Sequence, residues 1–346
     1  MAPRWTFAEK SFARNHSYRE YVQWTKDTGR DARNHQSWKD IRRTRVQSGP
    51  QPVEIAPGDD LQSRVIDQST QDWQDAQVAL QRLGRPVRLA KVADQHHPYA
   101  DPAALDLAMQ IVHEFEPDVL PALDDFFDFP SFSSFASARP AFKLRWDGNL
   151  ENAVEHHRAV MASWSDVAPD AVMPSLMGNH ERRLWRYLRK NASAASEYAL
   201  GKFIEDLTSH GILFLGEDAD ELELSPGLII MHGRYATKNT ATALKNTMDL
   251  YGYHRNVLMG HIHRLASLTK SGADYTVTAM ASGCLTELRP HYNPRHQNWQ
   301  HGIALAYYDS NSRDTALYNV EFIRSGGYLR AFWNQKEFRS KLARED

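Results

Sequence analysis

Short apolar segments that end in Asp, Asn or His recur along the chain from residue 87 onward, and this pattern constrains the fold most. Strands are expected at 87–93, 119–123, 172–177, 228–231 and 257–259, and again at 276–281, 303–308 and 316–322. Helices are expected at 101–115, with Asp101 as its N-cap, at about 148–164 and at 181–189. Alternating strands and helices predict an α/β fold in which helices cover sheets. Ligand sites in such folds lie at the carboxyl ends of strands, where these polar residues fall.

The polar residues that follow the expected strands are of the types that bind divalent metals. They are Asp94, His96, Asp125, Asn179, His180, His232, His261 and His263. Carboxylates and imidazoles suit Zn, Mn or Fe, and amide oxygens also bind hard divalent ions. One ion does not need so many ligands, whereas two ions that share a carboxylate do. The competing interpretation is a set of polar residues that only satisfy hydrogen bonds at the starts of loops.

The order of the motifs resembles that of the calcineurin-like metallophosphoesterases. The motifs are Asp94-Gln-His96, Leu-Asp-Asp125-Phe-Phe-Asp-Phe, Gly178-Asn-His-Glu181, His232-Gly233 and Gly260-His-Ile-His263. They fall within residues 87–325, and the segments at 282–285 and 298–302 resemble the phage and prophage branch of this family. The resemblance implies a four-layer α/β/β/α metallophosphoesterase sandwich, preceded here by a small helical N-terminal extension.

The resemblance also implies two divalent metal ions, with Mn favoured and Fe, Zn, Co or Ni as alternatives. It assigns the first ion to Asp94, His96, Asp125 and His263, and the second ion to Asp125, Asn179, His232 and His261. A hydroxide that bridges the two ions would attack the phosphoester. His180 would act at the leaving group as a catalytic residue, and Asp128 would orient His180 or a water.

One residue departs from the family pattern. The family usually has Gly immediately before the bridging Asp, and this chain has Asp124 there. The extra carboxylate either binds a third ion, weakens the affinity for phosphate, or points away from the metals. It therefore bears on metal preference and activity more than on the fold.

The net charge of −2 conceals a basic N-terminal segment. Residues 1–47 hold eleven basic and five acidic side chains, a formal charge of +6. Their pattern predicts two short helices around Gly29, which indicates either a helix-turn-helix or a solvated helical arm. A basic segment on an acidic body favours an anionic partner, and DNA is the predicted one. The expected organisation is a basic helical head (1–47), a linker with a polar helix (48–86), the metallophosphoesterase domain (87–325) and a C-terminal tail (326–346).

The predicted function is metal-dependent hydrolysis of phosphodiesters with DNA as the substrate, which is a nuclease activity. One alternative is a cyclic-nucleotide phosphodiesterase, nucleotide phosphatase or phosphoprotein phosphatase with the same metal core. The other is a DNA-binding protein whose metal site is degraded. Arg183, Arg234 and Lys238 are the predicted substrate-binding residues, because each follows a ligand motif with a cation that suits phosphate.

Cysteine content and hydropathy indicate the compartment. Cys284 is the single cysteine, so the chain forms no intramolecular disulfide and no Cys-rich zinc module. No apolar run reaches the length of a membrane span, and the first residues lack the apolar run of a signal peptide. These features predict a cytoplasmic protein without a membrane partner, in a bacterial host or prophage context. The oligomeric state is left open.

Overall fold

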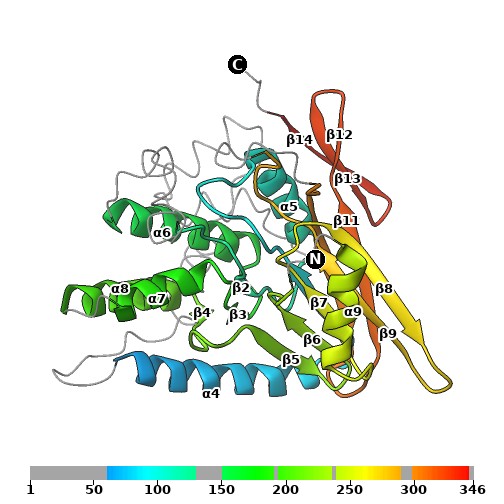
Figure 1. Ribbon diagram of the computed structural model, residues 1–346, viewed down its shortest axis with the longest axis horizontal. Helices are drawn as coiled ribbons and strands as arrows, with labels where there is room; N and C mark the ends of the chain where they lie inside the picture. The colour runs from blue at the N-terminus through cyan, green and yellow to red at the C-terminus, as the bar shows by residue number, and fades with distance from the viewer. Residues whose placement is uncertain (1–60, 130–149, 191–193, 236–238, 290–297, 343–346) are drawn as a thin grey trace, which may run out of the picture.

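The computed structural model describes residues 61–129, 150–190, 194–235, 239–289 and 298–342. The predicted basic head, with its candidate helix-turn-helix, lies outside these ranges. In the described part, two sheets pack face to face and helices cover their outer faces (Figure 1). The arrangement is the expected α/β/β/α order of four layers. No helix in this part is both long enough and apolar enough to cross a membrane.

The first sheet has the strand order β11-β10-β1-β2-β3-β4. Its strands are β1 (Val87–Lys91), β2 (Ala122–Leu123), β3 (Met173–Leu176), β4 (Ile212–Leu213), β10 (Gly302–Tyr308) and β11 (Thr315–Glu321). Strands β2, β3 and β4 are parallel, whereas β10 runs antiparallel to both β1 and β11. Parallel bridges from Val119 to Leu89 and to Val172 join the two groups into one sheet.

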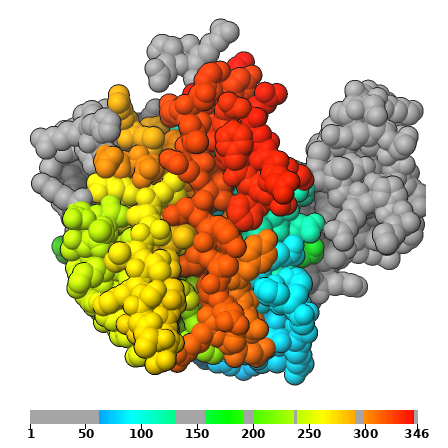
Figure 2. Space-filling model, turned by 90° about the vertical axis from the view of Figure 1, so that its right-hand side faces the viewer, coloured from blue at the N-terminus to red at the C-terminus, as the bar shows by residue number. Residues whose placement is uncertain are grey.

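The second sheet has the order β5-β6-β7-β9-β8. Its strands are β5 (Glu221–Ser225), β6 (Leu228–Met231), β7 (Asn256–Met259), β8 (Leu265–Ser271) and β9 (Thr276–Ser282). The three central strands are parallel, and β5 and β8 pair antiparallel at the two edges. In Figure 2 the yellow β8–β9 region lies beside the orange strands β10 and β11 of the first sheet.

Helices cover the outer face of each sheet (Figure 1). The first sheet is covered by α5 (Pro102–Phe115), α6 (Leu150–Val167), α7 (Glu181–Lys190) and α8 (Ala194–Ser209), and the second by α9 (Thr240–Leu250). Between the sheets, Leu89, Leu176, Ile230 and Leu258 are fully buried. The central strands are apolar on both faces because each sheet has a layer on either side.

Two elements outside the expected sandwich pack against it. Helix α4 (Leu61–Gln81) runs along one edge of the two sheets and buries Val65, Trp73 and Leu80 (Figure 1). The C-terminal strands β12 (Ile323–Ser325), β13 (Tyr328–Trp333) and β14 (Lys336–Lys341) form a separate antiparallel sheet beside α5. Because β12 pairs with β13, this small sheet continues across the domain boundary expected at residue 325.

The expected start of α5 is confirmed. Asp101 Oδ1 accepts hydrogen bonds from the backbone N–H groups of Ala103 at 2.9 Å and Ala104 at 3.1 Å, and Pro102 is the first helical residue. The other carboxylate oxygen accepts a hydrogen bond of 3.1 Å from Arg324 in β12. Asp101 therefore caps α5 and ties it to the C-terminal sheet.

We expect Asp101→Ala to lower the free energy of unfolding by about 1–2 kcal/mol, because two N-terminal N–H groups of α5 lose their acceptor. Asp101→Asn keeps an acceptor oxygen and should lose clearly less. Urea unfolding followed by circular dichroism measures both. Equal losses for the two variants would mean that the cap is not the source of the stabilisation.

Candidate metal centre

The residues predicted as metal ligands meet at the carboxyl ends of strands from both sheets. Asp94 and His96 follow β1, Asp125 follows β2 and Asn179 follows β3 in the first sheet, while His232 follows β6 and both His261 and His263 follow β7 in the second. Among the described residues, three sets of side chains have ligand atoms within 4.8 Å of one another: Asp94, His96 and His263; Asp125, His232 and His261; and His96, Asp128 and His180. Such sets could hold divalent metal ions.

The first set converges on a small volume. His263 Nε2 lies 3.1 Å from Asp94 Oδ1 and 3.0 Å from His96 Nε2. Asp94 Oδ1 is buried and makes no hydrogen bond within the described residues. Two ligands that each lie at bonding distance from one ion are about 3.0–3.5 Å apart. The spacing and the uncommitted carboxylate oxygen therefore fit a metal ion.

The second set has the same spacing and includes an amide. His232 Nε2 lies 2.9 Å from Asn179 Oδ1, 3.1 Å from His261 Nδ1 and 3.3 Å from Asp125 Oδ2. Asp125 Oδ2 also lies 3.9 Å from His96 Nε2 of the first set. This oxygen therefore lies between the two sets, where a ligand shared by two ions would have to lie.

Each of the two carboxylates has one oxygen held by the backbone. Asp94 Oδ2 accepts from the N–H of His261 at 2.8 Å, and Asp125 Oδ1 accepts from the N–H of His180 at 2.8 Å. The first bond joins loops of different sheets. Because one oxygen is fixed in this way, the other is aimed at the cluster.

The loops reach this arrangement through unusual backbone conformations. Asp94, His96, Asp125, His261 and His263 all have φ between 52° and 71°. This left-handed region is unfavourable for residues that carry a Cβ. Strain of this kind persists only where the surrounding structure imposes it, and it concentrates at functional sites.

Two glycines allow the carboxylates to approach the backbone. A Cβ at Gly178 would lie 2.0 Å from Asp125 Oδ1, and a Cβ at Gly260 would lie 2.7 Å from Asp94 Oδ2. Glu181, buried at the start of α7, accepts hydrogen bonds from the N–H groups of Asp125 at 3.0 Å and Phe127 at 3.1 Å. His180 and Glu181 of this motif therefore hydrogen-bond to the Asp125 loop, and Gly178 leaves room for it.

The carboxylates and imidazoles of the cluster shift one another's pKa values. Burial by itself raises the pKa of Asp94 and of Asp125, but neighbouring imidazoles, chiefly His263 and His232 respectively, outweigh it and lower both pKa values. Burial lowers the pKa of His96, whereas a hydrogen bond to Asp128 and the nearby carboxylate of Asp94 raise it to about 10. Burial and the proximity of His232 lower the pKa of His261 to about 4. The carboxylates are thus ionised near neutral pH, as metal ligands must be.

His180, the predicted catalytic residue, lies beside Asp125 with both ring nitrogens engaged. Its Nδ1 pairs with Asp128 Oδ1, and its Nε2 accepts a hydrogen bond of 2.7 Å from the Arg183 guanidinium. Asp128 Oδ1 also accepts from His96 Nδ1 at 3.2 Å. Burial lowers the pKa of His180. Asp128 therefore orients one imidazole of the first set together with His180.

The predicted substrate-binding cations differ in their position. Arg183 lies at the cluster, where it contacts His180 and the backbone oxygen of Asp128. Arg234 forms a surface ion pair of 2.9 Å with Glu221. Lys238 lies outside the described residues. Of the two cations that the structure describes, only Arg183 is brought to the candidate centre.

The cluster opens to solvent on one side. Asn179, His180 and His261 are partly exposed, whereas Asp94 and Asp125 are buried. The partly exposed ring of Trp299 lies edge-on to His263, with 4.4 Å between ring centroids. A substrate would therefore approach across the partly exposed ligands.

Sequence reasoning missed one residue behind the cluster. Lys91, in the otherwise apolar strand β1, is fully buried and contacts the carboxylate of Asp124. In the sequence, burial of Lys91 is indicated only by its place as a charged residue near the end of the strand expected at 87–93.

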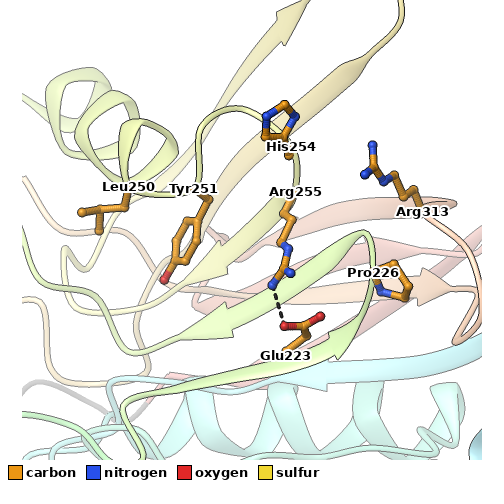
Figure 3. Close-up of a pocket in the computed structure, with 7 residues that line it drawn as sticks. All are labelled: Glu223, Pro226, Leu250, Tyr251, His254, Arg255 and Arg313. Atoms are coloured by element: carbon orange, nitrogen blue, oxygen red, sulfur yellow. Dashed lines mark hydrogen bonds and ion pairs between the residues drawn. The ribbon is translucent and has the colours of Figure 1, made fainter.

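A cavity of about 480 Å³ lies away from this centre (Figure 3). It is lined by Glu223, Pro226, Leu250, Tyr251, His254, Arg255 and Arg313. These residues border the amino ends of β6 and β7, opposite the ends that carry the candidate ligands. None of the predicted site residues lines it.

Comparisons with known proteins find relatives in phages. The chain is 27% identical over 238 residues to the Gene 54 protein of Mycobacterium phage D29, covering 65% of this chain and 90% of the relative. It is 26% identical over 237 residues to the Gene 54 protein of Mycobacterium phage L5, covering 64% and 89%. No family model matches the chain.

Solved structures give distant similarities. A predicted phosphoesterase of Streptococcus pneumoniae TIGR4 aligns with a TM-score of 0.30 and 11% identity, over 74% of this chain and 98% of that one. Vacuolar Protein Sorting 29 of Cryptosporidium parvum aligns with a TM-score of 0.33 and 9% identity, over 74% and 96%. The function is therefore inferred from the site itself.

We expect Gly178→Ala to reduce divalent metal affinity by at least about 10-fold, because the new Cβ displaces the Asp125 carboxylate that lies between the two ligand sets. Equilibrium dialysis against Mn²⁺ with elemental analysis measures the effect. Gly84→Ala is the matched control, since a Cβ there meets no atom within 4 Å and only the positive φ of 67° is penalised. If both variants bind the same amount of metal, the close packing of the Asp125 carboxylate against Gly178 is not needed for metal binding.

Proposed function

We propose that the protein is a dinuclear metal-dependent phosphoesterase that hydrolyses phosphodiesters, with DNA as its substrate. The observation that carries this proposal is the place of Asp125 Oδ2, 3.3 Å from His232 Nε2 and 3.9 Å from His96 Nε2. In the proposed centre, Asp94, His96, Asp125 and His263 hold one ion, and Asp125, Asn179, His232 and His261 hold the other.

The donor set leaves a centre of this kind with net positive charge. Two divalent ions bring four positive charges, while Asp94 and Asp125 return two and the neutral ligands none. When bound, such ions attract a phosphate group and make a nucleophile available at neutral pH. The ligand types are compatible with Mn, Fe, Zn, Co and Ni alike, and Mn is the favoured metal of the proposal.

The neighbouring side chains supply the remaining functions. Asp128 fixes the imidazole of His180 through Nδ1, so that Nε2 is directed toward the open side of the cluster. From there His180 would stabilise the charge on the leaving-group oxygen, or protonate it in the state in which Nε2 carries a proton and Arg183 has turned away from it. Arg183, which contacts His180, is close enough to pair with a phosphate oxygen of the substrate.

Several observations support DNA over a small nucleotide. Residues 1–47 carry a formal charge of +6, which favours a polyanion. Phages D29 and L5 encode the relatives found. Trp299, partly exposed beside His263, offers an aromatic surface to a base. A small-nucleotide phosphoesterase with the same centre is the alternative, because the ligands themselves do not discriminate between the two.

The alternative of a degraded metal site has little support. Its single motive was the additional carboxylate of Asp124. That carboxylate is paired with Lys91, so it adds no net charge to the centre. All seven predicted ligands lie in the described part of the chain and have atoms in the cluster.

We expect His180→Ala to lower kcat for a phosphodiester by about 10²–10⁴-fold, because the reaction loses its general acid. The metal content of the variant should stay at the wild-type value, since His180 is not a ligand in the proposed centre. His254→Ala, an exposed histidine at the opposite end of the second sheet, is the matched control. Loss of metal from His180→Ala would show that this residue is a ligand and not a catalytic residue.

The substrate is tested on one Mn-loaded preparation of the full chain. Single- and double-stranded DNA, a bis-nitrophenyl diester, cyclic dinucleotides and nucleoside monophosphates are compared. We expect DNA cleavage that His180→Ala abolishes, and DNA binding that weakens as salt is raised. Turnover of the diester or a small nucleotide without DNA cleavage would replace DNA as the substrate but retain the phosphoesterase. No turnover of any phosphoester would overturn the enzymatic assignment.

A further inference from the structure

A buried ion pair lies directly behind the proposed metal centre. Lys91 and Asp124 have side chains that are 0% and 1% exposed, and the lysine Nζ contacts Asp124 Oδ2. Lys91 closes strand β1, among buried apolar residues such as Leu89 and Val92. Lysine and aspartate are almost never fully buried unless they are paired, so each requires the other here.

The second oxygen of Asp124 reaches the centre itself. Oδ1 accepts a hydrogen bond of 2.9 Å from Nδ1 of His232. The opposite nitrogen of the same ring, Nε2, faces Asn179, His261 and Asp125. Lys91, Asp124 and His232 thus form a chain of contacts that ends at the ligand atoms of the second set.

The backbone at Asp124 is fixed in a conformation that suits glycine. Its φ is 57°, its N–H donates to Leu176 O at 2.7 Å, and its own O accepts from the N–H of Asp94 at 2.9 Å. A residue with a Cβ is strained at this φ, although Asp tolerates it better than most residues. The side chain is therefore retained in spite of the backbone, which points to a role for the carboxylate.

We infer that Asp124 and Lys91 are positioning residues for His232. Asp124 holds the Nδ1 proton, so that the Nε2 lone pair is directed at the ion held by Asp125, Asn179 and His261. Lys91 cancels the negative charge that Asp124 would otherwise add to the centre. This inference rests on the proposed metal centre but not on DNA as its substrate.

The pair also completes a symmetry between the two ligand sets. His96 in the first set donates through Nδ1 to Asp128, as His232 in the second set does to Asp124. A carboxylate behind a ligand imidazole fixes its tautomer and raises its basicity. Each proposed ion would therefore be held by one imidazole that is supported in this way. With both oxygens of Asp124 engaged, neither a third ion nor repulsion of phosphate is expected from it.

The test compares two double variants that both lack Lys91, so that neither leaves a buried charge unpaired. Lys91→Met with Asp124→Asn keeps an oxygen that accepts from His232, and Asn is tolerated at positive φ. Lys91→Met with Asp124→Gly removes that acceptor and relieves the backbone. Stepwise Mn²⁺ affinity is measured by calorimetry on the full chain, with circular dichroism to establish that both variants are folded.

We expect the double variant with Asp124→Gly to bind one of the two ions about 10–100-fold more weakly than wild type does. The other ion should be bound with wild-type affinity. The double variant with Asp124→Asn should bind both ions within about 3-fold of wild type, which is well below the effect expected when the outer contact is lost. If Asp124 had only a structural role, the substitutions would affect stability, but the two double variants would not differ in their affinity for one ion alone. Equal affinities in the two double variants would overturn the inference while the metal centre stands.

The single variants test the pair itself. Lys91→Met and Asp124→Gly each leave one buried charge unpaired, so each should unfold at a lower urea concentration than their combination. Additive effects of the two substitutions would overturn the pairing. If wild-type protein binds no divalent ion, both the proposed function and this inference fail. If metal binding separates the variants but DNA is not cleaved, this inference stands and DNA is wrong as the substrate.

Discussion

The arrangement of the candidate centre depends on how the two sheets are packed against each other. Asp94, His96, Asp125 and Asn179 follow strands of the first sheet, and His232, His261 and His263 follow strands of the second. No single sheet supplies either ligand set. The distances of about 3 Å between ligand atoms are therefore set by the apolar layer between the sheets, where Leu89, Leu176, Ile230 and Leu258 are fully buried. A core packed as densely as an organic crystal can hold such distances, whereas a loose one cannot.

The strand ends could be predicted because burial and chemistry are both visible in the local pattern. An apolar run followed by Asp94 or His232 indicates a core strand that delivers a polar side chain to a sheet edge. The helix at 101–115 was predictable for the same reason, since Asp101 and Pro102 are local signals. Most of the central elements were expected within a few residues of their observed bounds.

Other features could not be predicted because they depend on contacts between distant segments. The pairing of Lys91 with Asp124 joins residues that lie in different strands, and neither residue type alone indicates burial. Strands β5 and β8 are edge strands with many exposed side chains, so their apolar signal is weak. The polar helix expected within residues 48–86 is present as α4, but its packing could not be predicted. The apolar residues that it buries, Val65, Trp73 and Leu80, indicate packing only once the sheet edge beside it is known.

The distribution of ligands over both sheets has a consequence for the stability of the sandwich as a whole. An ion held by Asp94, His96 and His263 would join the first sheet to the second, and so would an ion held by Asn179 and His232. Bound metal would thus act as a pair of cross-links across the interface between the halves of the molecule, much as disulfides do in proteins with oxidised cysteines. The chain has one cysteine and no such covalent link. Separation of the two sheets and release of the ions would then be the same event, and cohesion at this end of the molecule would depend on the supply of metal in its surroundings.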